Sequence, residues 1–354
     1  MKRVCVVRLG AYGDGIMVTP LLRLLKKDGY HVTMNCMKYG RPIFDNNPYI
    51  DEFLVHDEKI LNNDLDKYWA KLAKKYDRFI NLSESIEKTL LKQEGSPEFD
   101  WSHERRHGEC NVNYYDRTLE LGGYGHIKGQ NGELFFSKDE ENWGLSMRNH
   151  PKDTFKILWS LSGSSFHKTY PMSEAVATEF LDTCEDAMIY TVGGNVEGVL
   201  EWDHRRTMRR CGEWNIRKSL IMTKYADLVI GPETGVLNAA GCFDTPKILF
   251  LSHSSRENLS KYWKNCDVIS PFVLDAPCHP CHQLHYTLKS CPQRAIGSIL
   301  NVKTNTQEVV TAPACVATIS QERVLEALLR AYQQWKEKQD GSLRGEVSPA
   351  VLCA

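Results

Sequence analysis

The stretch VCVVRLGAYGDGIMVTPLLRLLKK, residues 4–27, decides the fold of this chain. An apolar, β-rich run at 4–9 passes through a glycine loop into a helical pattern at 16–27, where apolar residues recur every three or four positions. A strand that leads into a helix in this way is the first unit of an α/β fold with a parallel sheet. We therefore examined whether the same unit repeats along the chain.

The alternation of strand and helix patterns does repeat, and it does so in two blocks. The first block predicts strands at 4–9, 31–37, 52–57 and 78–83 and helices at 16–27 and 65–76. The second predicts strands at 155–163, 187–194, 226–231 and 247–252 and helices at 172–184, 215–225 and 320–339. Between them the pattern breaks at about 90–150, and SPEFDWSHERRHGE (96–109) is typical of a loop.

Two Rossmann-like domains follow from this pattern, at 1–150 and 151–340, with a mobile tail at 341–354. Facing domains of this kind place a ligand cleft at the carboxyl ends of both sheets. The chain of 354 residues carries 44 basic and 45 acidic residues, so its net charge of -1 gives no overall attraction to nucleic acid or membranes. The first residues lack a signal-peptide pattern and no run is apolar enough for a membrane span, so we expect a cytoplasmic protein.

The first loop, RLGAYGD (8–14), leaves two interpretations open. It is not G-x-G-x-x-G, because Gly10 and Gly13 are three apart, and no acidic residue closes a second strand at the expected distance. A dinucleotide-binding dehydrogenase is therefore disfavoured. Asp14 either caps the helix that follows or takes part in chemistry.

Two further loops follow strands of the second block. LSGSSFHKTYP (161–171) ends in Lys168, which fits a phosphate site or a plain surface lysine equally well. GPETGVLNAAG (231–241) opens a small-residue helix, whose unpaired N–H groups and positive potential suit a diphosphate. Glu233 would then orient a sugar hydroxyl or a metal rather than contact phosphate.

Together, RLGAYGD with TPLLRLLKK, the glycine loop with HKTYP, and ADLVIGPETGVLNAAG with TPKILFLS resemble glycosyltransferase family 9. These are the ADP-heptose-dependent heptosyltransferases with the GT-B fold, and the resemblance is weakest at about 90–150. It implies an inverting transfer of heptose or a related sugar from a nucleoside diphosphate, here an ADP-sugar, to an acceptor hydroxyl. The attack passes through an oxocarbenium-like state, so a carboxylate must take the acceptor proton while N–H or cationic groups stabilise the departing diphosphate.

The resemblance also implies roles for individual residues. Asp14 corresponds to the general base. The residues expected to contact the donor are Gly13, Lys168, Glu197, Glu233, Thr234, Gly235, Val236 and Asn238. Among them Lys168 and the amides of 234–236 would hold the diphosphate, and Glu197 the ribose. Glu233 and Asn238 replace the family's aspartate and histidine, which puts the identity of the sugar in doubt more than the reaction type.

The acceptor is left open by the sequence. Lipopolysaccharide core, a protein serine or threonine, and a modified nucleic-acid base all fit. A non-catalytic module that binds a sugar nucleotide or a metal is the competing class of function, although such a module has no reason to keep Asp14 on the acceptor side. A basic cluster, HRRTMRRCGEWNIRK (204–218), fits an anion-steering surface or a solvated helix face.

Four of the twelve cysteines gather in one irregular segment at 278–315. Cys278, Cys281, Cys291 and Cys315 give the spacing C-x2-C-x9-C-x23-C, which suits tetrahedral zinc or iron, with free thiols as the alternative. The segment also resembles the iron-binding finger of the bacterial autotransporter heptosyltransferases. We expect a structural iron or zinc, with His279, His282 and His285 as possible substitute ligands.

Overall fold

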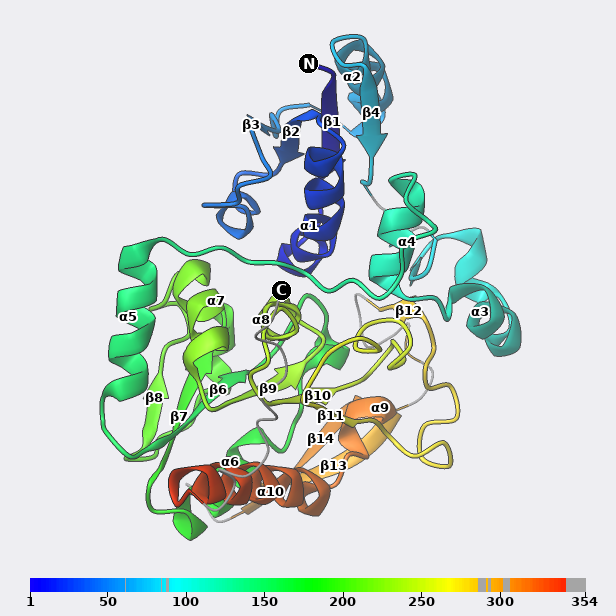
Figure 1. Cartoon of the computed structure of the whole chain (residues 1–354). Coiled ribbons are helices and arrows are strands. Elements are labelled where there is room, and N and C mark those ends of the chain that lie inside the picture. The colour runs from blue at the N-terminus through cyan, green and yellow to red at the C-terminus, as the bar shows by residue number, and fades with distance from the viewer. Residues whose placement is uncertain are drawn as a thin grey trace.

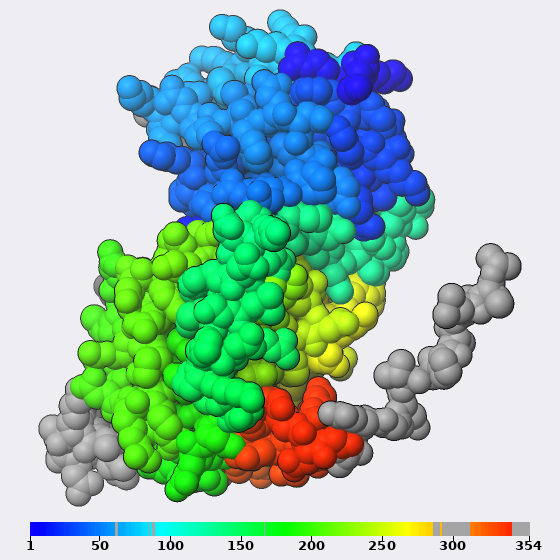
Figure 2. Space-filling model, turned by 60° about the vertical axis from the view of Figure 1, so that its left-hand side comes forward, coloured from blue at the N-terminus to red at the C-terminus, as the bar shows by residue number. Residues whose placement is uncertain are grey.

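The computed structural model describes residues 1–60, 62–83, 85–86, 89–285, 291, 294–301 and 306–341. The chain forms two α/β units, one above the other in Figure 1, and Figure 2 shows them as two lobes in contact. Of the tail expected at 341–354, all but residue 341 lies outside the described residues. No helix in the described ranges combines the length and the apolar character needed to span a membrane.

The N-terminal unit is built on a parallel sheet of four strands in the order β3-β2-β1-β4. Its elements are β1 (Arg3–Arg8), α1 (Tyr12–Lys27), β2 (His31–Cys36), η1 (Arg41–Ile43), β3 (Glu52–Val55), η2 (Asn62–Asp64), α2 (Leu65–Ala73) and β4 (Arg78–Asn81). Val4 and Val6 of β1 pack in one apolar cluster with α1, whereas Cys5 and Val7 pack with α2. A strand covered by helices on both faces needs the continuous apolar run seen in the sequence.

The C-terminal unit holds a parallel sheet of six strands in the order β11-β10-β9-β6-β7-β8. Its strands are β6 (Phe155–Ser160), β7 (Ala187–Val192), β8 (Thr207–Arg209), β9 (Leu228–Pro232), β10 (Lys247–Phe250) and β11 (Cys266–Ile269). Its helices are η4 (Phe166–Lys168), α6 (Ser173–Thr183), η5 (Val196–Leu200), α7 (Ile216–Tyr225), α8 (Gly235–Ala240) and α10 (Gln321–Gln339), and α10 packs on α6. The chain reverses direction across the sheet between β6 and β9, which opens a crevice at their carboxyl ends.

The segment between the two sheets is helical, so the prediction of a loop over 96–109 is wrong. It contains β5 (Lys92–Gln93), η3 (Pro97–Asp100), α3 (His103–Cys110), α4 (Tyr114–Leu121) and α5 (Lys138–Asn149). The side chain of Ser102 caps α3, and buried Arg106 donates from Nε to the carbonyl of Cys281 at 3.0 Å. A polar helix held by a distant partner has no apolar periodicity, and its sequence therefore resembles a loop.

Helix α5 precedes residue 150 in sequence but packs on α7 of the second unit. Arg217 of α7 donates from Nη2 to Glu140 of α5 at 2.8 Å. Gly144 of α5 lies against Tyr225, where a Cβ atom would come within 2.2 Å of the ring. The chain thus crosses to the C-terminal unit before the predicted domain boundary (Figure 1).

The cysteine segment is more regular than predicted. Strand β12 (Gln283–Leu284) pairs with β5, and β13 (Arg294–Asn301) and β14 (Thr306–Pro313) form an antiparallel hairpin before α9 (Ala314–Ala317). The hairpin occupies the long interval between Cys291 and Cys315, and its register pairs residue 294 with 313. The two ends of that interval therefore lie close together, which the spacing alone did not reveal.

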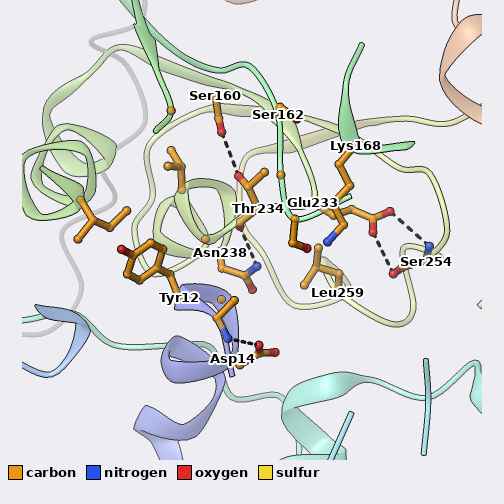
Figure 3. Close-up of a pocket in the computed structure, with 18 of the residues that line it drawn as sticks. Tyr12, Asp14, Ser160, Ser162, Lys168, Glu233, Thr234, Asn238, Ser254 and Leu259 are labelled. Atoms are coloured by element: carbon orange, nitrogen blue, oxygen red, sulfur yellow. Dashed lines mark hydrogen bonds between the residues drawn. The ribbon is translucent and has the colours of Figure 1, made fainter. Parts of the chain in front are cut away.

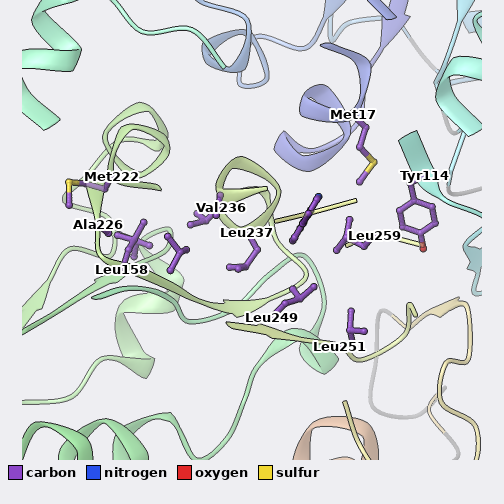
Figure 4. Close-up of a cluster of buried hydrophobic side chains, with 14 of the residues drawn as sticks. Met17, Tyr114, Leu158, Met222, Ala226, Val236, Leu237, Leu249, Leu251 and Leu259 are labelled. Carbon is purple, nitrogen blue, oxygen red and sulfur yellow. The ribbon is translucent and has the colours of Figure 1, made fainter. Parts of the chain in front are cut away.

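The two units are in direct contact where α1 meets α8. A Cβ atom on Gly235 would lie 2.6 Å from the Cβ of Tyr12, and one on Gly13 would lie 3.0 Å from Asn238 Nδ2. Beside this contact, one apolar cluster joins Met17 and Tyr114 of the N-terminal unit to residues of the second, as Figure 4 shows. The cleft is therefore closed along one side by packed side chains.

Candidate active site

A cavity of about 480 Å³ lies between the two units. The loop before α1 lines it from the N-terminal unit, and the loops after β6, β7, β9 and β10 line it from the second. The sequence-predicted residues that line it are Gly13, Asp14, Lys168, Glu197, Glu233, Thr234, Gly235, Val236 and Asn238. The structure thus brings the expected base and all expected donor contacts to one place, as Figure 3 shows for several of them, whereas the four cysteines do not line it.

Asp14 is held rigidly at the N-terminus of α1. The helix begins at Tyr12, before the predicted start, so Asp14 is its third residue and not its N-cap; its Oδ2 accepts from the backbone N–H of the N-cap residue Ala11 at 2.7 Å. Its Oδ1 pairs with Nη2 of Arg8 at 2.7 Å, and Arg8 also donates to the carbonyl of Leu82 at 2.8 Å. The side chain of Arg8 is only 2% exposed, and that of Asp14 is 19% exposed. A carboxylate that is bonded in this way can therefore also face the cavity.

The loop after β9 begins α8 with Thr234 as its cap. Thr234 Oγ1 accepts from the N–H of Leu237 at 3.3 Å and lies 3.2 Å from Ser160 Oγ. Lys168 lies across Gly163, where a Cβ atom would be 2.8 Å from the lysine Cδ. The absence of a side chain at 163 lets the ammonium reach the cavity beside this loop.

Asn238 makes hydrogen bonds to both units. Its Nδ2 donates to the carbonyl of Thr234 at 2.9 Å, and its Oδ1 accepts from the hydroxyl of Tyr115 at 3.4 Å. Tyr115 belongs to α4, which packs on α1. The amide thus joins the donor-side loop to the N-terminal unit.

Glu233 is fully enclosed and bonded to the loop after β10. Its Oε1 accepts from the N–H of Ser252 at 2.7 Å, and its Oε2 lies 2.9 Å from His253 Nδ1. Oε2 also accepts from Ser254 Oγ at 3.1 Å (Figure 3). Burial alone would raise the pKa of Glu233, but His253, Lys168 and the Ser252 amide outweigh it and lower the pKa. Burial lowers the pKa of His253, and the neighbouring Glu233 carboxylate opposes this shift.

Sequence reasoning missed the aromatic wall of the cavity. Trp214 lines it and stacks on Tyr190, with ring centroids 5.6 Å apart and planes 21° apart. Trp214 lies inside the basic cluster of 204–218, where the charged residues are the stronger sequence signal. Those charges are partly paired on the surface, since Arg209 contacts Asp203 at 2.6 Å and Arg210 contacts Glu213 at 2.5 Å.

The four cysteines lie close enough to influence one another electrostatically. The pKa of Cys281 is raised to about 12, chiefly by burial and to a smaller extent by Cys278 and Cys291. Burial also raises the pKa of Cys315, with added contributions from the other three thiols. Among the described residues, however, no group of three or more His, Cys, Asp or Glu side chains is arranged to hold a metal ion.

No family model matches this sequence, and no curated protein sequence matches it. Solved structures do match. The ADP-heptose LPS heptosyltransferase II of E. coli is 15% identical over 95% of this chain and 100% of its own, with a TM-score of 0.62. A family 9 glycosyltransferase from Veillonella parvula is 16% identical over 94% of this chain and 98% of its own, with a TM-score of 0.64.

A third similar structure is the iron-containing dodecameric glycosyltransferase TibC of enterotoxigenic E. coli. It is 10% identical over 94% of this chain and 77% of its own, with a TM-score of 0.59. TibC has also been solved in complex with ADP-D-β-D-heptose. Similarity at these identities shows the fold, so the predicted fold class is confirmed: the chain has the GT-B fold, with two Rossmann-like domains facing across a cleft.

Because the pKa of Glu233 is lowered in the folded chain, its carboxylate should stabilise the fold in a pH-dependent way. The stabilisation from a carboxylate with a lowered pKa is complete above the unfolded pKa, about 4.3, and is lost as the pH falls toward the folded pKa. Glu233→Gln should therefore reduce the free energy of unfolding at pH 7 by about 1.5–3 kcal/mol, the usual worth of hydrogen bonds to a charged group. Urea denaturation from pH 7 to pH 3 measures this, and the difference should shrink below about pH 4.

The matched control is Glu326→Gln, on the exposed face of α10, which should change the stability little at any pH. A deficit of Glu233→Gln that stays constant down to pH 3 would show that the carboxylate does not carry the charge inferred here.

Proposed function

We propose that this chain is an inverting glycosyltransferase that moves heptose or a related sugar from a nucleoside-diphosphate sugar, an ADP-sugar, to an acceptor hydroxyl. The observation that carries the proposal is the meeting of Asp14, from one domain, with Lys168 and the 234–236 loop of the other in a single cavity. The GT-B fold shared with ADP-heptose heptosyltransferases supports it. The solved complex of TibC with ADP-D-β-D-heptose supports the class of donor.

In the proposed reaction Asp14 acts as the general base. It takes the proton of the acceptor hydroxyl as the new bond to the anomeric carbon forms. The bond from that carbon to the diphosphate oxygen breaks on the opposite face, and the electron pair leaves with the diphosphate. Lys168 and the amides of 234–236 stabilise the departing charge. Asp14 and the diphosphate loop belong to different domains, which suits attack and departure on opposite faces of the sugar.

Other residues that line the cavity would make the remaining contacts to the donor. Glu197, on η5 after β7, would hold the ribose hydroxyls, and Gly13 would let the donor approach the first loop. Trp214 offers a flat ring for the nucleobase, supported from behind by Tyr190. Asn238 cannot carry the charge of the family's histidine. Lys168 is the sole lysine or arginine among the described cavity-lining residues, so it carries more of the leaving-group charge.

Lys168→Ala tests the donor site. Loss of a charge-assisted contact to phosphate should weaken ADP binding by about 1–3 kcal/mol, or roughly 5- to 150-fold. Isothermal titration calorimetry with ADP measures this. The control is Lys264→Ala, because the side chain of Lys264 is 72% exposed and pairs with Asp244 away from the cavity. Equal ADP affinity in both variants would remove Lys168 from the donor site.

Asp14→Asn tests the general base. The amide keeps the shape and can still accept from the N–H of Ala11, but it cannot take the proton, so turnover should fall about 10²- to 10⁴-fold while ADP binding stays nearly unchanged. Turnover is followed by release of ADP from an ADP-sugar. The substitution also removes the counter-charge of buried Arg8 and will lower stability, so rates are compared well below the melting temperature.

The control for the base is Asp139→Asn, in the first turn of α5, where the residue is exposed and distant from the cavity. It should retain full turnover. If Asp14→Asn also turns over within a few-fold of the parent, Asp14 is a hydrogen-bond and ion-pair partner only.

We also propose that Cys278, Cys281, Cys291 and Cys315 hold one structural iron or zinc. The mutual influence of the four thiols supports a shared site, since buried thiolates need a cation to offset their charge. The hairpin of β13 and β14 brings the chain beside residues 291 and 315 together. The site would fix the segment and supply no step of the reaction.

Elemental analysis of the purified protein tests the metal. It should return about one equivalent of iron or zinc, which Cys278→Ser should lose together with part of the stability. Cys266→Ser, at a half-buried thiol of β11 outside the segment, should keep the metal. Metal-free parent protein with the same melting temperature as Cys278→Ser would contradict the proposal.

A further inference from the structure

Part of the wall of the same cavity is apolar, and we call this part of the cavity the apolar chamber. The side chains that line this part come from α1, from residues 86–91, from α4, from the loop after β10 and from the cysteine segment. They are Met17, Ile86, Leu91, Tyr114, Leu259 and Leu284, which we call the apolar chamber residues. Figure 4 shows Met17 and Tyr114 on the side of the N-terminal unit and Leu259 opposite them.

Contacts between the two units hold the chamber in shape. The N–H of Tyr114 donates to the carbonyl of Asn258 at 2.8 Å, and Asn258 Nδ2 donates to the carbonyls of Cys110 at 2.7 Å and Val112 at 2.9 Å. The hydroxyl of Tyr114 lies 3.0 Å from Ser254 Oγ. The polar tip of this tyrosine is thus engaged, and its ring is left for the chamber.

The cysteine segment supplies one wall. Leu284 of β12 pairs in register with Gln93 of β5, and the N–H of Lys92 donates to the carbonyl of His282 at 2.8 Å. This small sheet fixes Leu284 beside Leu91 at the edge of the cavity. A segment that follows the second sheet in sequence therefore contributes an apolar side chain to the cavity that Asp14 also lines.

The charges around the cavity oppose an anionic acceptor. Asp14, Glu197 and Glu233 line it, and Lys168 stands among the donor-side residues next to Glu233. The nearest other cation to Asp14, Arg8, is buried behind it and already paired. A carboxylate or phosphate on the acceptor would be desolvated and would be repelled by Asp14. The chamber residues include no cation that could offset this cost.

We propose that the acceptor hydroxyl is carried by an uncharged, largely apolar alkyl or aryl group that packs in this chamber, with Leu284 of the cysteine segment as a specificity-determining residue. The inference rests on the proposed function, because it assigns the acceptor class of the same site. Packing of an apolar group against these side chains removes its surface from water, which favours binding without any ion pair.

The test compares two alcohols of the same shape and different charge. 4-Nitrobenzyl alcohol is neutral, and 4-(hydroxymethyl)benzoate replaces its nitro group with a carboxylate. Binding of each to the full chain in saturating ADP is measured by NMR titration. We expect the neutral alcohol to bind at least tenfold more tightly. Leu284→Lys should lose at least tenfold in affinity for the neutral alcohol and gain affinity for the carboxylate.

The matched control is Leu274→Lys, because Leu274 is 96% exposed and far from the chamber lining, so neither affinity should change. Met17→Lys, on α1, repeats the test from the opposite wall and keeps it decisive if Leu284→Lys fails to fold. ADP affinity is measured on every variant and should stay within about twofold of the parent.

The outcomes separate this inference from the proposed function. If the parent binds ADP but binds the carboxylate as well as the nitro compound, or binds neither alcohol, the apolar acceptor is overturned and the donor site stands. If both lysine variants fold and keep the parent's preference, the chamber residues do not select the acceptor. Failure of the parent to bind ADP overturns the proposed function and this inference together.

Discussion

The close approach of α1 to α8 is the contact on which the rest of the site depends. A Cβ atom on Gly235 would collide with Tyr12 at 2.6 Å, and one on Gly13 would press on Asn238 Nδ2 at 3.0 Å. Asp14 and the loop at 234–236 belong to different domains, and without this approach water would separate them. The glycines therefore matter here for interdomain packing as well as for room beside a ligand.

The first loop holds a structurally engaged carboxylate at the wall of the cavity, where the proposed general base is needed. Asp14 accepts from the N–H of Ala11 and pairs with buried Arg8, yet it lines the cavity. The two contacts fix the side chain in one orientation before any acceptor arrives. Such preorganisation is what a general base requires, because a mobile carboxylate spends little time in the productive geometry.

Glu233 links the donor side to the cysteine segment. Its carboxylate is bonded to Ser252, His253 and Ser254, and the carbonyls of Ser252 and His253 lie within hydrogen-bonding distance of His279 Nδ1, at 2.8 Å, and the His282 N–H, at 2.9 Å. Glu233 is thus connected, through the loop after β10, to a segment that contributes Leu284 to the wall of the cavity.

The sequence by itself predicted the strands of the two sheets, apart from β8 and β11, and nine of the residues that line the cavity. Strands such as β1 and β6 and helices such as α1 and α10 carry strong local periodicity, so their patterns predicted them within a few residues. The order of the three loops along the chain then indicated Asp14, Lys168 and Thr234 as candidate site residues, because glycine turns and helix starts can be recognised from the local sequence.

Only the tertiary structure decided α3, the hairpin of β13 and β14, the pairing of β5 with β12, and the places of Trp214 and Leu284. Helix α3 and the pairing of β5 with β12 depend on partners more than a hundred residues away, as Arg106 with Cys281 does, whereas the hairpin pairs residues that are near in sequence. Contacts of that kind are absent from any local pattern, because the energy that stabilises them is gained when distant segments meet.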